Sequence, residues 1–218
     1  MTIESFILIG GRSTRFGSDK FAVQFGGKSL IQRTAETIRN AIEPSKITLV
    51  AATNDQFPAT VLTTPFPVIF DLHAGRGPIG GFHAALAYAR TDWILVLACD
   101  LPFISSDLLR HLADQISDEF DAIAPIQPDD RPQPLCALYR VKPCLKIIEQ
   151  PLINNRSAPP VRAIFDKLRT KFVPFEDIRH LSDSENFFLN MNKPDDFILM
   201  NKINDKIRHP AAKRSKAR

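Results

Sequence analysis

Cysteine is scarce in this chain of 218 residues, and long apolar runs are missing. The three cysteines, Cys99, Cys136 and Cys144, are odd in number and far apart, which fits neither a disulfide framework nor a zinc site. The apolar run at residues 94–99 is far too short to cross a bilayer. No basic stretch leads into a long apolar segment at the N-terminus. We therefore expect a cytoplasmic protein with no membrane partner, because free thiols persist in a reducing compartment.

The patterns of several enzyme classes are absent as well. The sequence has no nucleophile-elbow pattern, no pair of histidines at metal-binding helical spacing and no convincing combination of cysteine and histidine. Covalent catalysis is therefore not indicated.

An excess of positive charge is missing from the body of the chain, although the formal net charge is +4. Residues 206–218 carry six lysines and arginines and no acid, so 22 basic residues face 24 acidic ones in residues 1–205. A body without basic excess does not indicate nucleic-acid binding. We predict one domain over residues 1–205, followed by a basic, disordered tail over residues 206–218.

Short apolar runs alternate with segments of helical periodicity, and the hydrophobic content of 44% suits a protein with a real core. Strands are predicted at Phe6–Ile9, Ile47–Ala51, Val68–Phe70, Trp93–Ala98, Ala122–Pro125 and Leu135–Tyr139, with weaker patterns at Phe172–Val173 and Phe187–Leu189. Helices are predicted at 29–42, at 81–90, after a cap at Ser105 or Ser106, and at 141–149, 158–169 and 195–207. This order predicts a three-layer α/β/α, Rossmann-like fold with a mostly parallel sheet. Ligands of such sheets bind beyond the carboxyl ends of the strands.

The loop after the first predicted strand combines glycines with cations. Gly10 and Gly11 open it, and Arg15 and Lys20 follow within ten residues. Glycines let backbone N–H groups approach a ligand closely, and the cations add positive charge to the same loop. This combination predicts a cradle for a nucleoside triphosphate.

A single acid, Asp100, follows the buried strand predicted at Trp93–Ala98. A carboxylate at this position can coordinate Mg²⁺, which in turn bridges phosphate oxygens. A helix cap or turn residue is the structural alternative, and the two roles are compatible.

The loop after the third predicted strand, residues 71–81, holds Asp71 and four glycines. Asp71 could accept a hydrogen bond from a guanine edge or a sugar hydroxyl, and Gly80 lets the backbone approach a base or ribose. The spacing Gly75-x-Gly77-x-x-Gly80 also matches a dinucleotide fingerprint, which keeps an NAD-binding oxidoreductase open as an alternative. The residues Gly26-Gly27-Lys28-Ser29 resemble the end of a P-loop, but we predict a hairpin turn and a helix cap there.

These segments together resemble nucleotidyltransferases with the nucleotide-diphospho-sugar transferase fold, and most closely the molybdenum cofactor guanylyltransferases. The resemblance is carried in order by residues 8–20, Asp71 with 77–81, 99–102, 133–139 and 188–196. It implies transfer of GMP from GTP to the phosphate of molybdenum-molybdopterin, with Mg²⁺ as cofactor and pyrophosphate as the second product. A molybdoenzyme or a cofactor-insertion protein would then be the partner that receives the product.

The resemblance also implies roles for individual residues. The implied nucleotide-binding positions are Leu8, Ile9, Gly10, Gly11, Lys20, Asp71, Gly80 and Asp100. The implied catalytic residues are Lys20, Arg15 and Asp100, with Asp100 as the metal ligand. The segments 134–135 and 190–192 would lie toward the pterin. A cytidylyltransferase or a sugar-phosphate nucleotidyltransferase of the same fold remains the nearest alternative.

Overall fold

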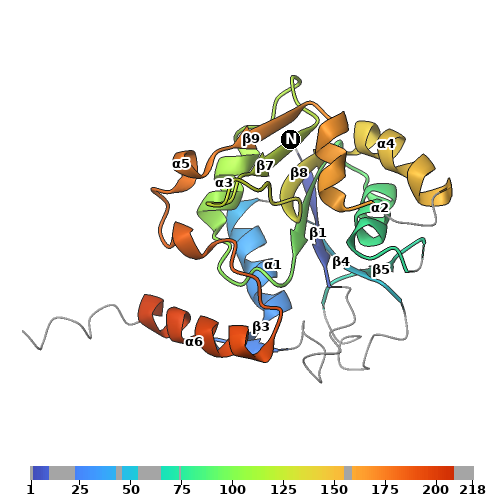
Figure 1. Cartoon of the computed structure of the whole chain (residues 1–218). Helices are drawn as coiled ribbons and strands as arrows, with labels where there is room; N and C mark the ends of the chain where they lie inside the picture. Colours follow the sequence, from blue (N-terminus) through green and yellow to red (C-terminus); the bar gives the residue numbers. More distant parts are fainter. Residues whose placement is uncertain are drawn as a thin grey trace, which may run out of the picture.

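The computed structural model describes residues 2–9, 23–42, 46–53, 65–73, 75–154 and 159–208 (Figure 1). Its main sheet has seven strands in the order β5-β4-β1-β6-β8-β7-β9. The strands are β1 Ile3–Leu8, β4 Ile47–Ala51, β5 Val68–Phe70, β6 Trp93–Ala98, β7 Ala122–Pro125, β8 Cys136–Arg140 and β9 Thr170–Val173. All neighbouring pairs are parallel except those of β8, which is antiparallel to β6 and β7. The predicted mostly parallel α/β sheet is therefore confirmed.

The central strands of the sheet are wholly buried, and their parallel pairing puts their carboxyl ends at one edge. Every residue of β1 and β6 is buried, and Leu8 pairs with both Val50 and Ala98. Alternate side chains of β1 enter two different cores, with Ile7 on one face and Phe6 on the other. A sheet that is covered on both faces needs apolar side chains on both sides of each strand, and a continuous apolar run provides them.

Helices cover both faces of this sheet (Figure 1). The helices α1 Leu30–Ala41 and α3 Ser106–Ala113 pack on one face, and α2 Pro78–Tyr88 and α4 Val141–Asn154 pack on the other, beside the 3₁₀ helix η3 Val161–Lys167. The predicted helix at 158–169 is therefore a shorter 3₁₀ helix. The helix α5 Phe175–Ile178 follows β9. No helix within the described ranges is both long and apolar enough to span a bilayer.

The residues that resemble the end of a P-loop form a hairpin, as predicted. The two short strands β2 Gln24–Phe25 and β3 Lys28–Ser29 pair antiparallel around Gly26 and Gly27, both with positive φ. Ser29 then caps α1, because its hydroxyl accepts from the Gln32 amide at 3.2 Å while the Gln32 side chain accepts from the Ser29 amide at 2.9 Å.

A small third core joins this hairpin to the last helix, α6 Pro194–Arg208 (Figure 1). Phe25 of the hairpin packs in one cluster with Phe103, Met191 and Met200. The helix extends three residues past the boundary expected at residue 205, and residues 209–218 lie outside the described part of the chain. Arg208 donates a hydrogen bond to the Gly26 carbonyl at 2.9 Å, so the last described turn of α6 contacts the hairpin.

The strand predicted at Phe187–Leu189 is wrong. The segment follows the short 3₁₀ helix η4 Ser184–Asn186 and continues as turns. Phe187 and Phe188 are both buried, and their rings lie edge to face at 6.3 Å. The apolar pattern of this segment therefore reflects side chains of a turn that enter the core.

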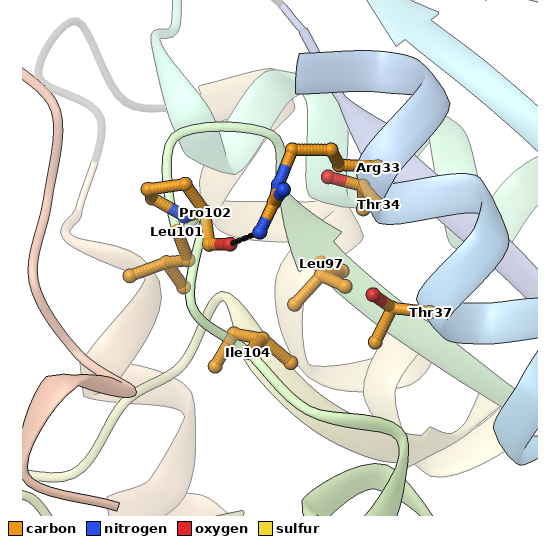
Figure 2. Close-up of a pocket in the computed structure, with 7 residues that line it drawn as sticks. All are labelled: Arg33, Thr34, Thr37, Leu97, Leu101, Pro102 and Ile104. Carbon is orange, nitrogen blue, oxygen red and sulfur yellow. Dashed lines mark hydrogen bonds between the residues drawn. The ribbon is translucent and has the colours of Figure 1, made fainter. Parts of the chain in front are cut away.

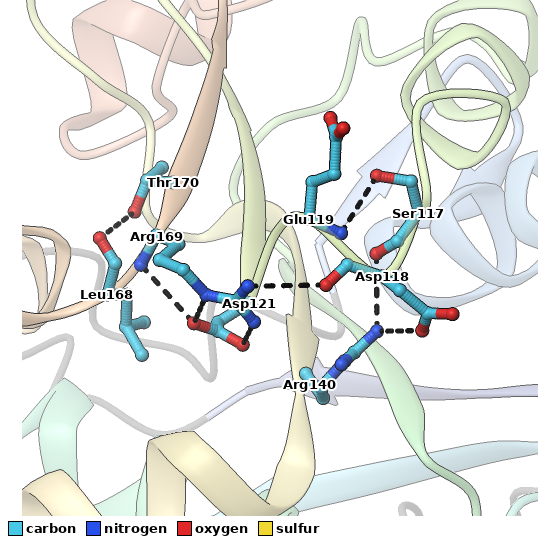
Figure 3. Close-up of polar contacts among 8 residues, drawn as sticks. All are labelled: Ser117, Asp118, Glu119, Asp121, Arg140, Leu168, Arg169 and Thr170. Carbon is cyan, nitrogen blue, oxygen red and sulfur yellow. Dashed lines mark hydrogen bonds and ion pairs between the residues drawn. The ribbon is translucent and has the colours of Figure 1, made fainter.

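A polar network lies at the amino ends of β7 and β9 (Figure 3). The Asp121 carboxylate accepts hydrogen bonds from two nitrogens of Arg169 at 2.9 and 2.8 Å, and Arg140 pairs with Asp118 at 2.8 Å. The hydrogen bonds from Arg169 hold the pKa of Asp121 below its usual value. This pairing stabilises the fold at neutral pH and is lost as pH falls through that lowered pKa. Because it lies at the edge opposite the strand carboxyl ends, we assign it to stability.

Candidate active site

The end of β1 lies directly beside the loop that carries Asp100. The Ile9 amide donates to the Val50 carbonyl at 2.9 Å, and the Cys99 amide donates to the Leu8 carbonyl at 3.2 Å. The side chains of Leu8 and Ile9 are buried, so a nucleotide could contact these two residues only through remaining backbone groups. The strand that leads into the glycine and cation loop and the loop that carries the acid are therefore joined by a hydrogen bond.

Asp71 lies at the same edge, at the end of β5. Its amide donates to the Ala51 carbonyl at 2.9 Å, which ties it to the neighbouring strand β4. A Cβ atom at Gly80 would lie 2.8 Å from the Asp71 Oδ2 atom, and one at Gly81 would lie 3.3 Å from Oδ1 and 3.4 Å from the Leu8 Cγ atom. The carboxylate therefore lies against the first turn of α2, and a side chain at position 80 would force it to shift.

The electrostatic state of Asp71 differs from that of an exposed acid. Burial raises its pKa from 3.8 to about 6, because a carboxylate loses hydration there. Ionised Asp71 is an acceptor only, which suits the N–H and hydroxyl donors of a nucleoside. The fraction of the protein able to offer this acceptor therefore rises with pH through about 6.

Asp71→Asn is expected to stabilise the free protein at pH 8 and to weaken nucleotide binding. A folded pKa above the unfolded one means that this group's contribution to stability is present below pH 4 and is lost as pH rises through about 6. Asn removes that cost at neutral pH, since it does not ionise. Thermal unfolding at pH 8 should show a higher Tm, and calorimetry should show about 10-fold weaker GTP binding, the scale of one hydrogen bond to a charged group.

The same pair of measurements at low pH provides the control. At pH 5 the folded wild-type carboxyl is mostly protonated, so the two proteins should have nearly the same GTP affinity. Their Tm difference should be smaller than at pH 8, because at pH 5 the cost of the buried carboxylate is only partly present. A lower Tm for the variant at pH 8 would contradict the cost that we assign to the buried carboxylate.

Asp100 follows β6 in a turn and is half-buried. Its carbonyl accepts a hydrogen bond from the Met191 amide at 3.0 Å. This bond places the segment 190–192 beside the acid, although nearly ninety residues separate the two in the sequence. Two segments that the resemblance assigns to the metal and to the pterin side are therefore neighbours.

The glycines of the dinucleotide fingerprint are not placed as that motif requires. β5 ends at Phe70, whereas Gly75 comes five residues later, with Gly77 as the residue before α2 and Pro78 as its first residue. The fingerprint needs its first glycine in the tight turn directly after the strand, and proline removes one N–H donor from the cradle. This geometry disfavours the NAD-binding alternative.

Four predicted site residues, Gly10, Gly11, Arg15 and Lys20, lie outside the described residues. What the structure shows is the chain on either side of them: Ile9 at the sheet edge, and Val23, which packs on the cluster that contains Phe103 and Met191. Both ends of the loop therefore start beside residues that flank Asp100.

Among the described residues, no group of three or more His, Cys, Asp or Glu side chains could hold a metal ion by itself. Mg²⁺ commonly takes only one or two carboxylates from a protein, with substrate phosphates and water as its other ligands. A half-buried acid at the end of a rigid strand, such as Asp100, fits that donor set.

Two groups near this edge were not assigned a role from the sequence. The rings of His73 and His83 lie 5.3 Å apart, and the Nδ1 atom of His83 is buried without a hydrogen-bond partner among the described residues. Burial lowers the pKa of His83, and the neighbouring His73 lowers it further, so the imidazole favours its neutral form. The sequence carried no signal for this pair, because ten residues and a turn separate its members.

The doubly covered sheet, with Asp71 and Asp100 at its carboxyl edge, fits an α/β nucleotidyltransferase. Residues 5–171 match the family described as the MobA-like NTP transferase domain, and the chain belongs to this family.

Relatives agree over almost the whole chain. A protein of Pelotomaculum thermopropionicum named "Probable molybdenum cofactor guanylyltransferase" is 34% identical over 192 residues, which are 88% of each chain. The "Molybdenum cofactor guanylyltransferase" of Desulfosudis oleivorans is 29% identical over 87% of this chain and 90% of its own. The crystal structure of molybdopterin-guanine dinucleotide biosynthesis protein A from Archaeoglobus fulgidus has a TM-score of 0.78 at 28% identity, covering 94% of this chain and all of that one.

Proposed function

We propose that this nucleotidyltransferase transfers GMP from GTP to the terminal phosphate of molybdenum-molybdopterin, giving the molybdopterin guanine dinucleotide cofactor and pyrophosphate. The observation that carries the proposal is the hydrogen bond from the Cys99 amide to the Leu8 carbonyl. It joins the strand that opens the glycine and cation loop to the loop of Asp100. The names of the relatives at about 30% identity support guanylyl rather than another nucleotidyl transfer.

The reaction needs positioning and charge neutralisation more than proton transfer. The oxygen of the pterin phosphate attacks the α-phosphorus of GTP in line, and the bond to the pyrophosphate oxygen breaks. A phosphate is already anionic near neutral pH, so no strong general base is required, and the residues act by orientation and electrostatic stabilisation.

Each proposed residue supplies one part of this orientation and charge neutralisation. Lys20 and the backbone N–H groups of Gly10 and Gly11 would neutralise phosphate charge, and Arg15 would assist at the leaving pyrophosphate. Asp100 would hold Mg²⁺, which supplies further charge neutralisation at the α-phosphate when it is bound. Asp71 would accept a hydrogen bond from the guanine edge or the ribose.

One assay separates this function from its alternatives. The protein is incubated with Mg²⁺ and each nucleoside triphosphate in turn, with molybdenum-molybdopterin or a sugar 1-phosphate as acceptor, and pyrophosphate release is measured. We expect release only with GTP and the pterin. Preference for CTP would identify a cytidylyltransferase, turnover of the sugar phosphate a sugar nucleotidyltransferase, and thermal stabilisation by NAD without pyrophosphate release an oxidoreductase. Any of these three results would overturn the proposal.

A further inference from the structure

Arg33 of α1 contacts both segments that flank the candidate site. Its Nη2 atom donates a hydrogen bond to the Pro102 carbonyl at 3.3 Å, two residues beyond Asp100 (Figure 2). Its Cζ atom also lies 4.8 Å from the centre of the Phe25 ring, in the hairpin that follows the glycine and cation loop. The Phe25 ring packs edge to face on Phe103 at 5.6 Å, and Phe103 directly follows Pro102, so these contacts form a closed circuit through the backbone.

We propose that Arg33 is a positioning residue for GMP transfer, which holds the loop of Asp100 at a fixed place relative to the hairpin of β2 and β3. The inference rests on the proposed function for its catalytic consequence. Its structural part, the hold on residues 100–102, stands on the contacts alone.

The setting of Arg33 argues against a purely stabilising role. Burial lowers the pKa of its guanidinium, the charge of Arg208 lowers it further, and Glu36 offsets these effects in part. None of the described ion pairs includes Arg33, and its Nε atom is buried without a hydrogen-bond partner among the described residues. An apolar side chain would pack on Phe25 without this desolvation cost. What the guanidinium adds is a directed hydrogen bond to the Pro102 carbonyl.

The space behind the Asp100 loop is closely filled, so a shift of Arg33 would be transmitted to it. Arg33, Thr34, Leu97, Leu101 and Pro102 are among the residues that line a cavity of about 10 Å³ (Figure 2). This is about the smallest volume that admits a single water molecule. The cavity is too small for a substrate group, and well-packed surroundings transmit small displacements rather than absorb them.

Loss of Arg33 should lower the rate because GMP transfer tolerates only small changes in the distances between the groups that bind the triphosphate. A metal ligand and the phosphate-binding groups must meet the same triphosphate, and a misplacement of about 1 Å can cost about 10²-fold in rate. Arg33 contacts the chain two residues after Asp100 and five residues after Lys20. It therefore ties the loop of Asp100 to the hairpin that follows Lys20 in the sequence.

Arg33→Met tests the proposal, with Arg39→Met as the matched control. Arg39 lies on the same helix and its Cζ atom is 5.1 Å from the Phe66 ring, so the control also removes an arginine from an aromatic face. We expect Arg33→Met to lower kcat about 10- to 100-fold, to raise the half-saturating Mg²⁺ concentration, and to leave the KM for GTP within about 3-fold. Arg33→Lys should recover part of kcat, because it keeps the charge but not the planar, stacked donor.

Hydrogen exchange provides a reading that needs no substrate. The Ile104 amide donates to the Leu101 carbonyl at 3.3 Å and the Met191 amide to the Asp100 carbonyl at 3.0 Å, so both report on the Asp100 loop. We expect faster exchange at both amides in Arg33→Met and wild-type exchange in Arg39→Met, with similar Tm values for the two variants.

The outcomes are distinct. Unchanged exchange in Arg33→Met, or losses of kcat and Tm that Arg39→Met reproduces, would overturn the proposal. Faster exchange with wild-type kcat would overturn the catalytic part. If the wild-type protein itself releases no pyrophosphate from GTP and the pterin, the proposed function fails, and exchange alone decides whether Arg33 holds the loop.

Discussion

Asp100→Asn is expected to lower the turnover number for GMP transfer by about 10²–10³-fold, the scale of losing one preorganised electrostatic group. Two hydrogen bonds hold the backbone around Asp100. The Cys99 amide donates to the Leu8 carbonyl, and the Met191 amide donates to the Asp100 carbonyl. Asn has nearly the same shape, so the variant should keep this geometry and lose only the negative charge that Mg²⁺ requires. Pyrophosphate release at saturating GTP and pterin, measured across a range of Mg²⁺ concentrations, gives the result.

Asp92→Asn is the matched control, because Asp92 is an exposed acid directly before the same strand β6, at its opposite end. It should retain wild-type turnover and the wild-type requirement for Mg²⁺. A folded Asp100→Asn protein with near-normal turnover would remove Asp100 from the metal site. A loss shared equally by Asp92→Asn would indicate a general effect of charge on β6.

The sheet was predictable from the sequence because buried parallel strands need continuous apolar runs. The runs at 47–51 and 93–98 match the fully buried strands β4 and β6, and the run at 68–70 matches the half-buried edge strand β5. The start of β1 was not predictable from the sequence, because its first half contains the polar residues Glu4 and Ser5, which are both buried. The Glu4 carboxylate accepts from the Arg90 amide at 2.6 Å and lies 3.6 Å from the Lys46 nitrogen. A polar residue becomes an interior one only when partners arrive from elsewhere in the chain, and no local pattern reveals them.

In the candidate site, the residues were predictable from the sequence but their contacts were not. Asp71, Gly80 and Asp100 were identified because strand ends, glycines and acids are visible locally, and the structure places all three at the carboxyl edge that the fold class implies. The contact that makes Gly80 necessary, with the Asp71 carboxylate, depends on the path of the loop between them. The sequence predicts that this glycine leaves space for a nucleotide, and that role stays a prediction.

Arg33 was missed for a related reason, although one signal was available. Leu30, Thr34 and Ile38 form the buried stripe of α1, and Arg33 lies three residues after Leu30, on the flank of that stripe. A cation at such a position indicates a partner in the interior. Its partners, Phe25 and Pro102, are 77 residues apart in the sequence, so only the folded chain shows that one guanidinium meets both.

Lys20→Ala is expected to lower kcat/KM for GTP by about 10²-fold without unfolding the protein, because one charge-assisted phosphate contact is lost. Lys20 precedes Val23 by three residues, a span of at most about 11 Å of extended chain. Val23 packs on the cluster that contains Phe103 and Met191. Phe103 follows Asp100 by three residues, and the Met191 amide donates a hydrogen bond to the Asp100 carbonyl. The proposed phosphate cation is therefore three residues along the sequence from a side chain that packs on the cluster containing Phe103, itself three residues after Asp100.

Lys28→Ala is the control for this change, since Lys28 is a lysine eight residues further along that pairs with Glu36 at 2.6 Å on the exposed side of α1. It should leave GTP use unchanged. Equal GTP affinity and rate in Lys20→Ala and wild type would exclude Lys20 from the site, and the triphosphate would then depend on the backbone N–H groups and on Arg15. A Lys20→Ala defect that high Mg²⁺ restores would show instead that cation and metal neutralise the same phosphate charge, as a shared site for Lys20 and Asp100 requires.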